Sequence, residues 1–312
     1  MITLPGTEMA IPRLKEIRQL KKADLHNHGL LGGKRSVVEK FYGRSFSRFK
    51  STGKGIVDLN NWIVKEYRPF FSLPGSIEKA IEAAFLQARS DGVVLLEMSV
   101  DGSFHRIFNV PPGKIIAALQ YYHKTVAPGI DFRPEIGFSK GFPIDVLLSD
   151  FETMNEYGYF RAIDLYNEED IQPVKNFKKL FQAARKSGLK CKAHAGEFGS
   201  AESVRETAEV LELDAIQHGI GAAGSPSVMR WLCDHNIQLN ICPTSNIRLK
   251  RIRSIRHHPI RTLYDHGVRV TINTDDTLIF GDGVSEQYLK LLRAGVFSIQ
   301  EIDQIRRNGL ED

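Results

Sequence analysis

The residues whose types and spacing best suit metal binding are three histidines and an aspartate: His26, His28, His194 and Asp275. His26 and His28 form a His-Asn-His triplet that closes an apolar run, and the period of two in a strand puts both imidazoles on one side, close enough to share an ion. An isolated triplet is equally typical of a surface or turn feature. His194 and Asp275 also follow apolar runs, and three imidazoles with one carboxylate suit zinc or another first-row divalent ion, leaving a position open for water. We therefore expect these four residues to hold one divalent metal ion, with zinc favoured.

Two more residues could act on a water held by such an ion. Glu197 ends the motif His-Ala-Gly-Glu, and His218 ends another apolar run. Metal-bound water can ionise near neutral pH and attack carbon while a neighbouring acid protonates the atom that gains charge. Glu197 suits the acid role, with an exposed loop carboxylate as the alternative. His218 suits a group that orients or deprotonates the water, with a further metal ligand or a hydrogen-bonded core histidine as alternatives. The expected catalytic residues are Glu197, His218 and the ligand Asp275.

The elements that must position these residues are visible as eight short apolar, β-branched or aromatic runs. Helical patterns lie between them, and repeated strand and helix units predict parallel strands with right-handed crossovers. Eight such units can close into a TIM-type (β/α)8 barrel, which assembles its active site from the carboxyl ends of its strands. An open doubly wound sheet is the alternative. The runs cover 23–26, 93–99, 132–138, 160–165, 189–194, 215–218, 237–242 and 269–273.

Three segments between the runs have the 3.6-residue period of a one-sided helix. The first follows Ser76 as the expected N-cap and stops at Gly92. The second covers 174–184, and the third covers 201–211 behind Ser200 as the expected N-cap.

Residues 30–73 are too many for an ordinary connection. Their mixture of Gly, Ser, basic and aromatic residues predicts a partly helical insertion after the first strand, which would cap the active site. The chain has no internal repeat, low-complexity tract or Pro/Ser-rich linker. We therefore expect residues 1–312 to form a single metal-dependent hydrolase barrel domain.

The composition is that of an ordinary soluble globular protein, with 42% hydrophobic and 25% charged residues. The formal net charge of +5 permits an anionic ligand without requiring one, so nucleic acid is not implied. No run approaches the roughly 18 apolar residues of a membrane span, and the N-terminus lacks a secretory apolar core, so we expect a cytoplasmic protein without a membrane partner. Cys191, Cys233 and Cys242 lie in apolar runs, which predicts buried free thiols. The oligomeric state is left open.

Five motifs in this order, HxH, HAGE, HG, CPTSN and NTDD, resemble those of the adenosine deaminase family. The resemblance runs from Asp24 to the region of Asn308. It implies a metal-bearing barrel with His26, His28, His194 and Asp275 as ligands, Glu197 as the acid that protonates purine N1, and His218 as the base that orients the water.

The resemblance also implies that Asp276 contacts purine N7. Two acceptors can meet there only through a proton, so the carboxyl pKa would have to be perturbed; support of the metal ligands is the alternative. The reaction implied is attack of a metal-activated water on C6 of a small-molecule 6-aminopurine, with release of ammonia. Deaminases that act on nucleic-acid bases use a PCxxC zinc motif, and no CxxC occurs here. Two-metal amidohydrolases typically have a lysine on strand four, where this chain reads Asp164-Leu165-Tyr166, so a mononuclear site fits better.

Departures from the family pattern bear on the substrate. Leu30 stands where the family usually has an aspartate that holds the ribose, and Tyr166-Asn167 stand where it commonly has an Ala-Gly pair whose backbone meets the purine. We expect Leu30, Tyr166, Asn167 and Asp276 to bind the substrate.

The expected substrate is a 6-aminopurine nucleoside or a related purine. A purine nucleotide is a second candidate, whose phosphate would bind the basic run 248–253 or Lys34 and Arg35, although a solvated helix face is the commoner explanation of such a run. An N6-modified purine or a different aminopurine is a third candidate. The chain could also be a mononuclear amidohydrolase with a different reaction. A non-enzymatic binding protein on the same fold is the rival from another class.

Overall fold

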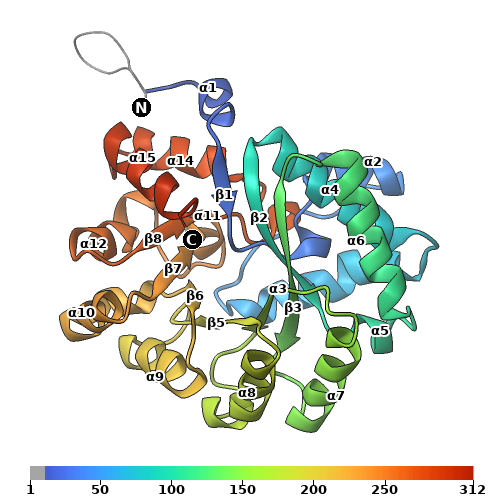
Figure 1. The fold of residues 1–312 in the computed structure, drawn as a ribbon. Coiled ribbons are helices and arrows are strands. Elements are labelled where there is room, and N and C mark those ends of the chain that lie inside the picture. The colour runs from blue at the N-terminus through green and yellow to red at the C-terminus, as the bar shows by residue number, and fades with distance from the viewer. Residues whose placement is uncertain (1–10, 312) are drawn as a thin grey trace.

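Eight parallel strands form the centre of the computed structural model, which describes residues 11–311 (Figure 1). Each strand pairs with the next one in chain order, from β1 to β8. Helices between the strands surround the sheet, as in a (β/α)8 barrel, which confirms the expected fold class. The strands are β1 Lys22–Asp24, β2 Val93–Asp101, β3 Asp131–Ser139, β4 Ala162–Tyr166, β5 Lys190–Ala195, β6 Ala215–His218, β7 Gln238–Ile241 and β8 Val270–Ile272.

The barrel closes where the chain leaves β8 and meets the segment after β1. Asn27 forms a parallel bridge with Asp275, and the backbone N–H of Asp275 donates to the carbonyl of His26 at 2.8 Å. Below this bridge, the backbone N–H of Leu25 donates to Oδ1 of Asn273 at 2.8 Å. The residues that close the barrel therefore include two of the expected metal ligands.

The His-Asn-His triplet lies just beyond β1, so the prediction that it closes the first strand was wrong by a few residues. Past Asp24 the chain forms only single bridges, because the side chain of Asn27 donates to Thr274 at 2.9 Å and to Asp24 at 3.3 Å, which turns the backbone toward β8. The two imidazoles still converge, with ring centroids 5.3 Å apart.

Helices and helical turns connect the strands and cover the outside of the barrel (Figure 1). The helices are α1 Leu14–Arg18, α2 Arg35–Tyr42, α3 Ile56–Trp62, α4 Ser76–Ser90, α5 Phe104–Ile107, α6 Pro112–Val126, α7 Ile144–Asn155, α8 Lys178–Lys186, α9 Ala201–Leu211, α10 Pro226–Asp234, α11 Pro243–Arg248, α12 Ile260–Asp265, α13 Thr277–Phe280, α14 Val284–Arg293 and α15 Ile299–Asn308. The tighter or wider turns are η1 Gly29–Leu31, η2 Ile63–Tyr67, η3 Arg68–Ser72, η4 Val174–Phe177, η5 Ile220–Gly224 and η6 Ile255–His257.

Two of the three helices predicted from periodicity begin where expected. α9 is capped by Ser200, whose hydroxyl accepts from the N–H of Ser203, and the segment 174–184 is η4 continuing into α8. In α4 the expected N-cap was wrong: Gly75, in a left-handed conformation, caps this helix, and Ser76 is its first residue. A glycine adopts that conformation without steric cost, so no side-chain cap was needed to start the helix.

The predicted insertion after the first strand is present and partly helical. It contains α2, α3, η2 and η3, and its aromatic side chains pack together and against α4. The ring of Phe46 lies 5.1 Å from that of Phe70 and 5.6 Å from that of Tyr67, and all three side chains are buried. Fully burying one such side chain contributes about 1.5–3 kcal/mol, so the insertion has a substantial core of its own.

The expectations for cysteines and membrane spans can also be compared with the structure. Cys191 and Cys242 are buried free thiols as predicted, whereas Cys233 is only half-buried, because α10 places it near the surface beside the carbonyl of His266. Among residues 11–311, no helix has the length and apolar character needed to cross a bilayer.

Gly92, between α4 and β2, lies against the backbone of Arg18 in α1, so substituting it tests how closely these segments pack. Its φ is +76°, and a Cβ there would lie 2.0 Å from the carbonyl oxygen of Arg18. We expect Gly92→Ala to lower the free energy of unfolding by about 2–4 kcal/mol, because left-handed strain and a backbone clash add. Urea unfolding measures this. The control is Gly158→Ala, where φ is +60° but no atom lies within 4 Å, with an expected loss of about 1 kcal/mol. Equal losses would contradict the clash.

Candidate active site

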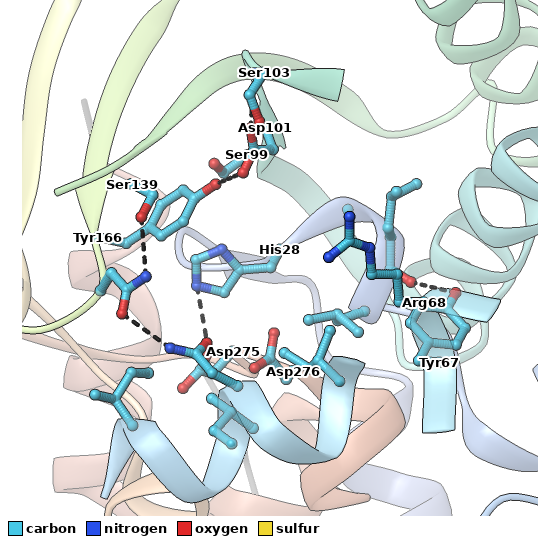
Figure 2. Close-up of a pocket in the computed structure, with 18 of the residues that line it drawn as sticks. His28, Tyr67, Arg68, Ser99, Asp101, Ser103, Ser139, Tyr166, Asp275 and Asp276 are labelled. Atoms are coloured by element: carbon cyan, nitrogen blue, oxygen red, sulfur yellow. Dashed lines mark hydrogen bonds and ion pairs between the residues drawn. The ribbon is translucent and has the colours of Figure 1, made fainter. Parts of the chain in front are cut away.

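A cavity of about 390 Å³ opens at the carboxyl ends of the strands. Its inner wall carries polar side chains from successive strand ends, among them Ser99 and Asp101 of β2, Ser139 after Phe138 in β3, and Tyr166 of β4 (Figure 2). The expected residues Leu30, Asn167, Glu197, His218 and Asp276 line the same cavity. The structure thus brings together residues that come from both ends of the chain.

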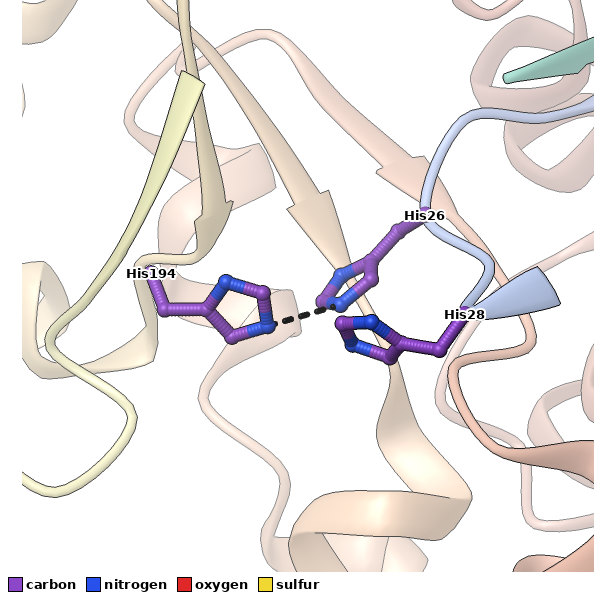
Figure 3. A group of neighbouring side chains, drawn as sticks. All are labelled: His26, His28 and His194. Atoms are coloured by element: carbon purple, nitrogen blue, oxygen red, sulfur yellow. Dashed lines mark hydrogen bonds between the residues drawn. The ribbon is translucent and has the colours of Figure 1, made fainter. Parts of the chain in front are cut away.

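Three histidines converge at the base of this cavity (Figure 3). Nε2 of His26 lies 3.1 Å from Nε2 of His194, and the ligand atoms of His26, His28 and His194 all lie within 4.8 Å of one another. Oδ1 of Asp275 lies 3.4 Å from Nε2 of His28 and 3.9 Å from Nε2 of His26. Three ring nitrogens and a carboxylate oxygen therefore face one small volume.

Contacts behind the rings set the tautomers of two histidines. Nδ1 of His194 donates to Oδ1 of Asp164 at 3.2 Å, and Nδ1 of His26 donates to the carbonyl of Asn240 at 3.3 Å. Each Nε2 is then left with a lone pair aimed at its neighbour, an arrangement that a cation between them stabilises. Burial lowers the pKa of His26 well below its ordinary value and also lowers the pKa of His28, so both rings are neutral as metal ligands must be. The donor set fits a divalent metal ion.

Glu197 and His218 lie beside this cluster. Oε2 of Glu197 is 3.5 Å from Nε2 of His218, which is 3.9 Å from Oδ2 of Asp275. Burial, followed by the charge of Asp275, raises the pKa of Glu197 well above its ordinary value, so its carboxyl can donate a proton near neutral pH. Burial lowers the pKa of His218 well below its ordinary value, which keeps the ring neutral.

Asp276 has a carboxyl suited to meet an acceptor on a ligand. Burial, and then the charge of Asp275, raises the pKa of Asp276 well above its ordinary value. Its Oδ1 is buried and has no hydrogen-bond partner within the described part of the chain. A protonated, unpartnered carboxyl facing a cavity can donate to a ring nitrogen.

Two of these residues hold strained backbone. His218 has a φ of +64° and Asp275 a φ of +63°, in the left-handed region that residues with a side chain rarely enter. His218 ends β6 and Asp275 lies three residues after the end of β8, and both side chains line the cavity. Such strain is typical of functional sites, where the surrounding structure maintains it.

The segment that carries Glu197 is held from both sides. The carboxylate of Glu169 accepts from the backbone N–H groups of Gly196 and Phe198, each at 2.7 Å. Arg251 donates to the carbonyls of Glu197 and Phe198, both at 3.2 Å. These bonds fix the peptide units on either side of the acid.

The basic run 248–253 does not form a helix face, since α11 ends at Arg248 and Lys250 has a φ of +60°. Its cations do not line the cavity, although Leu249 does. Arg35 pairs with Glu39 at 2.8 Å. The arginine that does line the cavity is Arg68 of η3, and nothing in the local sequence pattern singled it out.

Sequence reasoning also missed Asp101, Asp164 and Asn60. Asp101 accepts from the hydroxyl of Tyr166, and Asn60 of the insertion donates to Oδ1 of Asn167 at 3.1 Å. Asp101 and Ser139 end strands just as His218 does, and that position was the available signal. Asn60 had none, because its place depends on how the insertion folds back.

Comparison with known proteins identifies the family. The sequence model described as adenosine deaminase matches residues 153–312. A protein of Treponema pallidum whose assigned name is adenosine/adenine deaminase is 33% identical over 285 residues, covering 91% of this chain and 95% of that protein. The chain belongs to the adenosine deaminase family.

Solved structures share the fold of this family member. An amidohydrolase from Burkholderia ambifaria with bound Zn has a TM-score of 0.82 at 21% identity, covering 98% of this chain and 88% of the other. The N6-methyl-AMP deaminase of Arabidopsis thaliana has a TM-score of 0.78 at 18% identity, covering 95% and 92%. The expected family is thus confirmed, and this adenosine deaminase family member is a hydrolytic deaminase of purines.

Asp164 provides a test of the metal site that leaves the ligands in place. Asp164→Ala removes the carboxylate behind His194, so we expect the affinity for zinc to fall about 10–100-fold, measured by competition with a chromophoric chelator. Asp150→Ala is the control, because Asp150 is also buried and also pairs with a histidine, His105, at 2.9 Å outside this cluster. Equal zinc affinity in the two variants would contradict the role of Asp164.

Proposed function

We propose that this cavity catalyses hydrolytic deamination at C6 of a 6-aminopurine, nucleoside or related purine. The observation that supports this proposal most strongly is that a histidine cluster lies beside two carboxyls, those of Glu197 and Asp276. Burial raises the pKa of both carboxyls and so favours their protonated form. Water adds across the C6–N1 bond and ammonia leaves, so the product is the corresponding 6-oxopurine.

The proposed cofactor is one divalent ion, most simply zinc, held by His26, His28, His194 and Asp275. The converging Nε2 atoms and the tautomers set by Asp164 and the carbonyl of Asn240 support it. Such an ion, when bound, supplies a water of lowered pKa and an electrophilic centre beside it.

The remaining roles belong to side chains of the chain itself. The protonated carboxyl of Glu197 donates to N1 as C6 becomes tetrahedral, which places the developing charge next to a donor. His218 holds the attacking water, and the protonated carboxyl of Asp276 donates to N7. All three side chains are buried, so their hydrogen bonds act in a medium of low dielectric constant.

The substrate also meets a wall formed by Tyr166, Asn167 and Leu30. Tyr166 is held by its bond to Asp101, and Asn167 by a bond from its own Nδ2 to Oγ of Ser139 at 2.9 Å. The carbonyl of Leu30 accepts from the hydroxyl of Tyr67 at 2.7 Å. These contacts make the wall rigid, which favours selection among purines by shape.

A purine nucleotide is the second candidate, favoured by Arg68 at the cavity wall. The basic run favours it less, because Arg251 already binds two carbonyls. Comparing AMP with adenosine as substrates, in the native protein and in Arg68→Ala, distinguishes the two: a nucleotide enzyme prefers AMP and loses that preference in the variant.

Glu197→Gln tests the proposed chemistry. The amide cannot deliver a proton to N1, so we expect kcat for the best aminopurine to fall about 10²–10⁴-fold while zinc content and folding are kept. Ammonia release and the ultraviolet change of the purine measure turnover. Glu202→Gln, on the exposed side of α9, is the control and should retain full activity. If the native, zinc-loaded protein turns over no 6-aminopurine, the proposed function fails; if Glu197→Gln keeps activity, its role as acid fails.

A further inference from the structure

A second cavity, of about 290 Å³, lies beside the segment that carries His194 and Glu197. Its walls come from the loops after β3 and β4, from η4 and from α9. We call it the side cavity. Of the residues that the structure describes, none lines both the side cavity and the active-site cavity. The proposed deamination therefore leaves the side cavity without a role.

The side cavity contains a buried cationic side chain with unused donors. Lys140 is 4% exposed, and its Nζ donates to the carbonyl of His194 at 2.8 Å. An ammonium group has three N–H donors, so two of them remain, and no carboxylate within residues 11–311 forms an ion pair with Lys140. Because a buried charge is normally paired, we expect an anionic oxygen of a ligand to complete the surroundings of Lys140.

A hydroxyl on α9 is also unpartnered. Thr207 lines the side cavity and is 8% exposed, but its hydroxyl has no hydrogen-bond partner in the described part of the chain. A threonine in a helix often donates to the carbonyl four residues earlier, as Thr125 does to Tyr121 in α6 at 2.8 Å. Because buried polar groups are normally hydrogen-bonded, the hydroxyl of Thr207 indicates a partner that binds in the side cavity.

Negative charge lies at the solvent side of the side cavity. Asp170 and Glu206 are exposed, and neither forms an ion pair or a side-chain hydrogen bond with another described residue. The side cavity also has an apolar wall, formed by Val174 and the buried Phe177 of η4. An ammonium group, a hydroxyl, two free carboxylates and an apolar wall thus surround one space. A molecule that matches this set carries an anionic group, a cationic group and an aliphatic side chain.

Two residues of the side cavity hold the segment that carries the candidate acid. Besides the bond from Lys140 to His194, the carboxylate of Glu169 accepts from the backbone N–H groups on both sides of Glu197, each at 2.7 Å. Lys140 and Glu169 both line the side cavity. A ligand bound there therefore contacts the side chains that fix this segment of the active site.

We propose that the side cavity binds an α-amino acid with an aliphatic side chain, and that the bound molecule activates the enzyme. Its carboxylate accepts from Lys140 and Thr207, its ammonium group pairs with Asp170 and Glu206, and its side chain packs on η4. The amino acid joins the loops after β3 and β4 to α9, so it restricts the motion of the segment 194–198. A more ordered acid spends more time in its reactive position, which raises turnover. Binding at this site does not depend on the proposed function, whereas the effect on turnover does.

Calorimetric titration of the zinc-loaded protein with L-valine, L-isoleucine and L-leucine tests the site. We expect at least one of the three to bind with a Kd of about 1 mM or lower. Removing the carboxylate or the ammonium group from that amino acid should weaken binding about tenfold or more, because each group makes charge-assisted hydrogen bonds. For leucine, the two truncated probes are 3-methylbutylamine and 4-methylpentanoate.

Two substitutions on α9 place the ligand in the side cavity. Thr207→Val and Glu206→Gln should each weaken binding of the amino acid about threefold or more, and should leave turnover without the amino acid unchanged. Glu202→Gln is the control, because Glu202 is exposed one turn earlier on α9 and does not line the side cavity. This variant should bind the amino acid as the native protein does, and equal losses in all three variants would contradict the site.

Hydrogen exchange at the backbone N–H groups of Gly196 and Phe198 measures the link to the active site. We expect the saturating amino acid to slow this exchange about fivefold or more, and to raise kcat/KM for the best 6-aminopurine by a similar factor. The inference is overturned if none of the three amino acids binds, if the truncated probes bind equally well, or if exchange or kcat/KM is unchanged in an active protein. Binding and slower exchange without turnover of any 6-aminopurine would instead overturn the proposed function.

Discussion

The bridge that closes the barrel is the interaction on which the active site depends. A parallel sheet of eight strands has two unpaired edges until its last strand reaches its first, and here they meet through Asn27 and Asp275. The same two peptide segments carry His26, His28 and Asp275. Because the N–H of Asp275 is bonded to the carbonyl of His26, closing the barrel and assembling the cation site are one event. The positions of these candidate ligands are therefore fixed by the same bond that closes the barrel.

Burial then determines the chemistry of the groups around that bridge. A carboxyl removed from water and placed near another carboxylate keeps its proton, and an imidazole in the same surroundings stays neutral. Glu197 and Asp276 can thereby donate hydrogen bonds, whereas His26 and His28 keep the free lone pairs that a metal ligand needs. One physical effect, desolvation, thus assigns opposite hydrogen-bonding roles to residues a few ångströms apart.

Local patterns in the sequence were sufficient for the elements and for the innermost residues. Short apolar, β-branched or aromatic runs identified all eight strands with small errors at their ends, although buried polar residues such as Glu135, Asp164 and Lys192 interrupt these runs. The motif residues at their ends then fall on one rim by the geometry of a parallel barrel, as Glu197 and His218 do. The N-cap of α4 was misjudged because a glycine, not a hydroxyl, begins that helix.

Apart from Leu30, Tyr166 and Asn167, much of the cavity wall could not be predicted from local patterns. Arg68 and Asn60 come from an insertion whose fold depends on aromatic packing among residues without a period, and the contact of Asp164 with His194 joins adjacent strands. Arg251 shows the opposite kind of error. Its charge suggested that it could bind phosphate, but its guanidinium donates to two backbone carbonyls. Charge is visible in a sequence, whereas its partner is not.

The left-handed backbone at His218 and Asp275 has a consequence for the history of the fold. The left-handed conformation of a residue with a side chain lowers the stability of the fold by about 1–3 kcal/mol at each position, a loss that glycine would avoid. The residues at these positions are therefore kept for their side chains. In a descendant of this chain that is no longer selected for activity, substitution by glycine would be favoured at these two positions, because it stabilises the barrel. Glycine at either position in a related sequence would therefore indicate a barrel that has lost its catalytic activity.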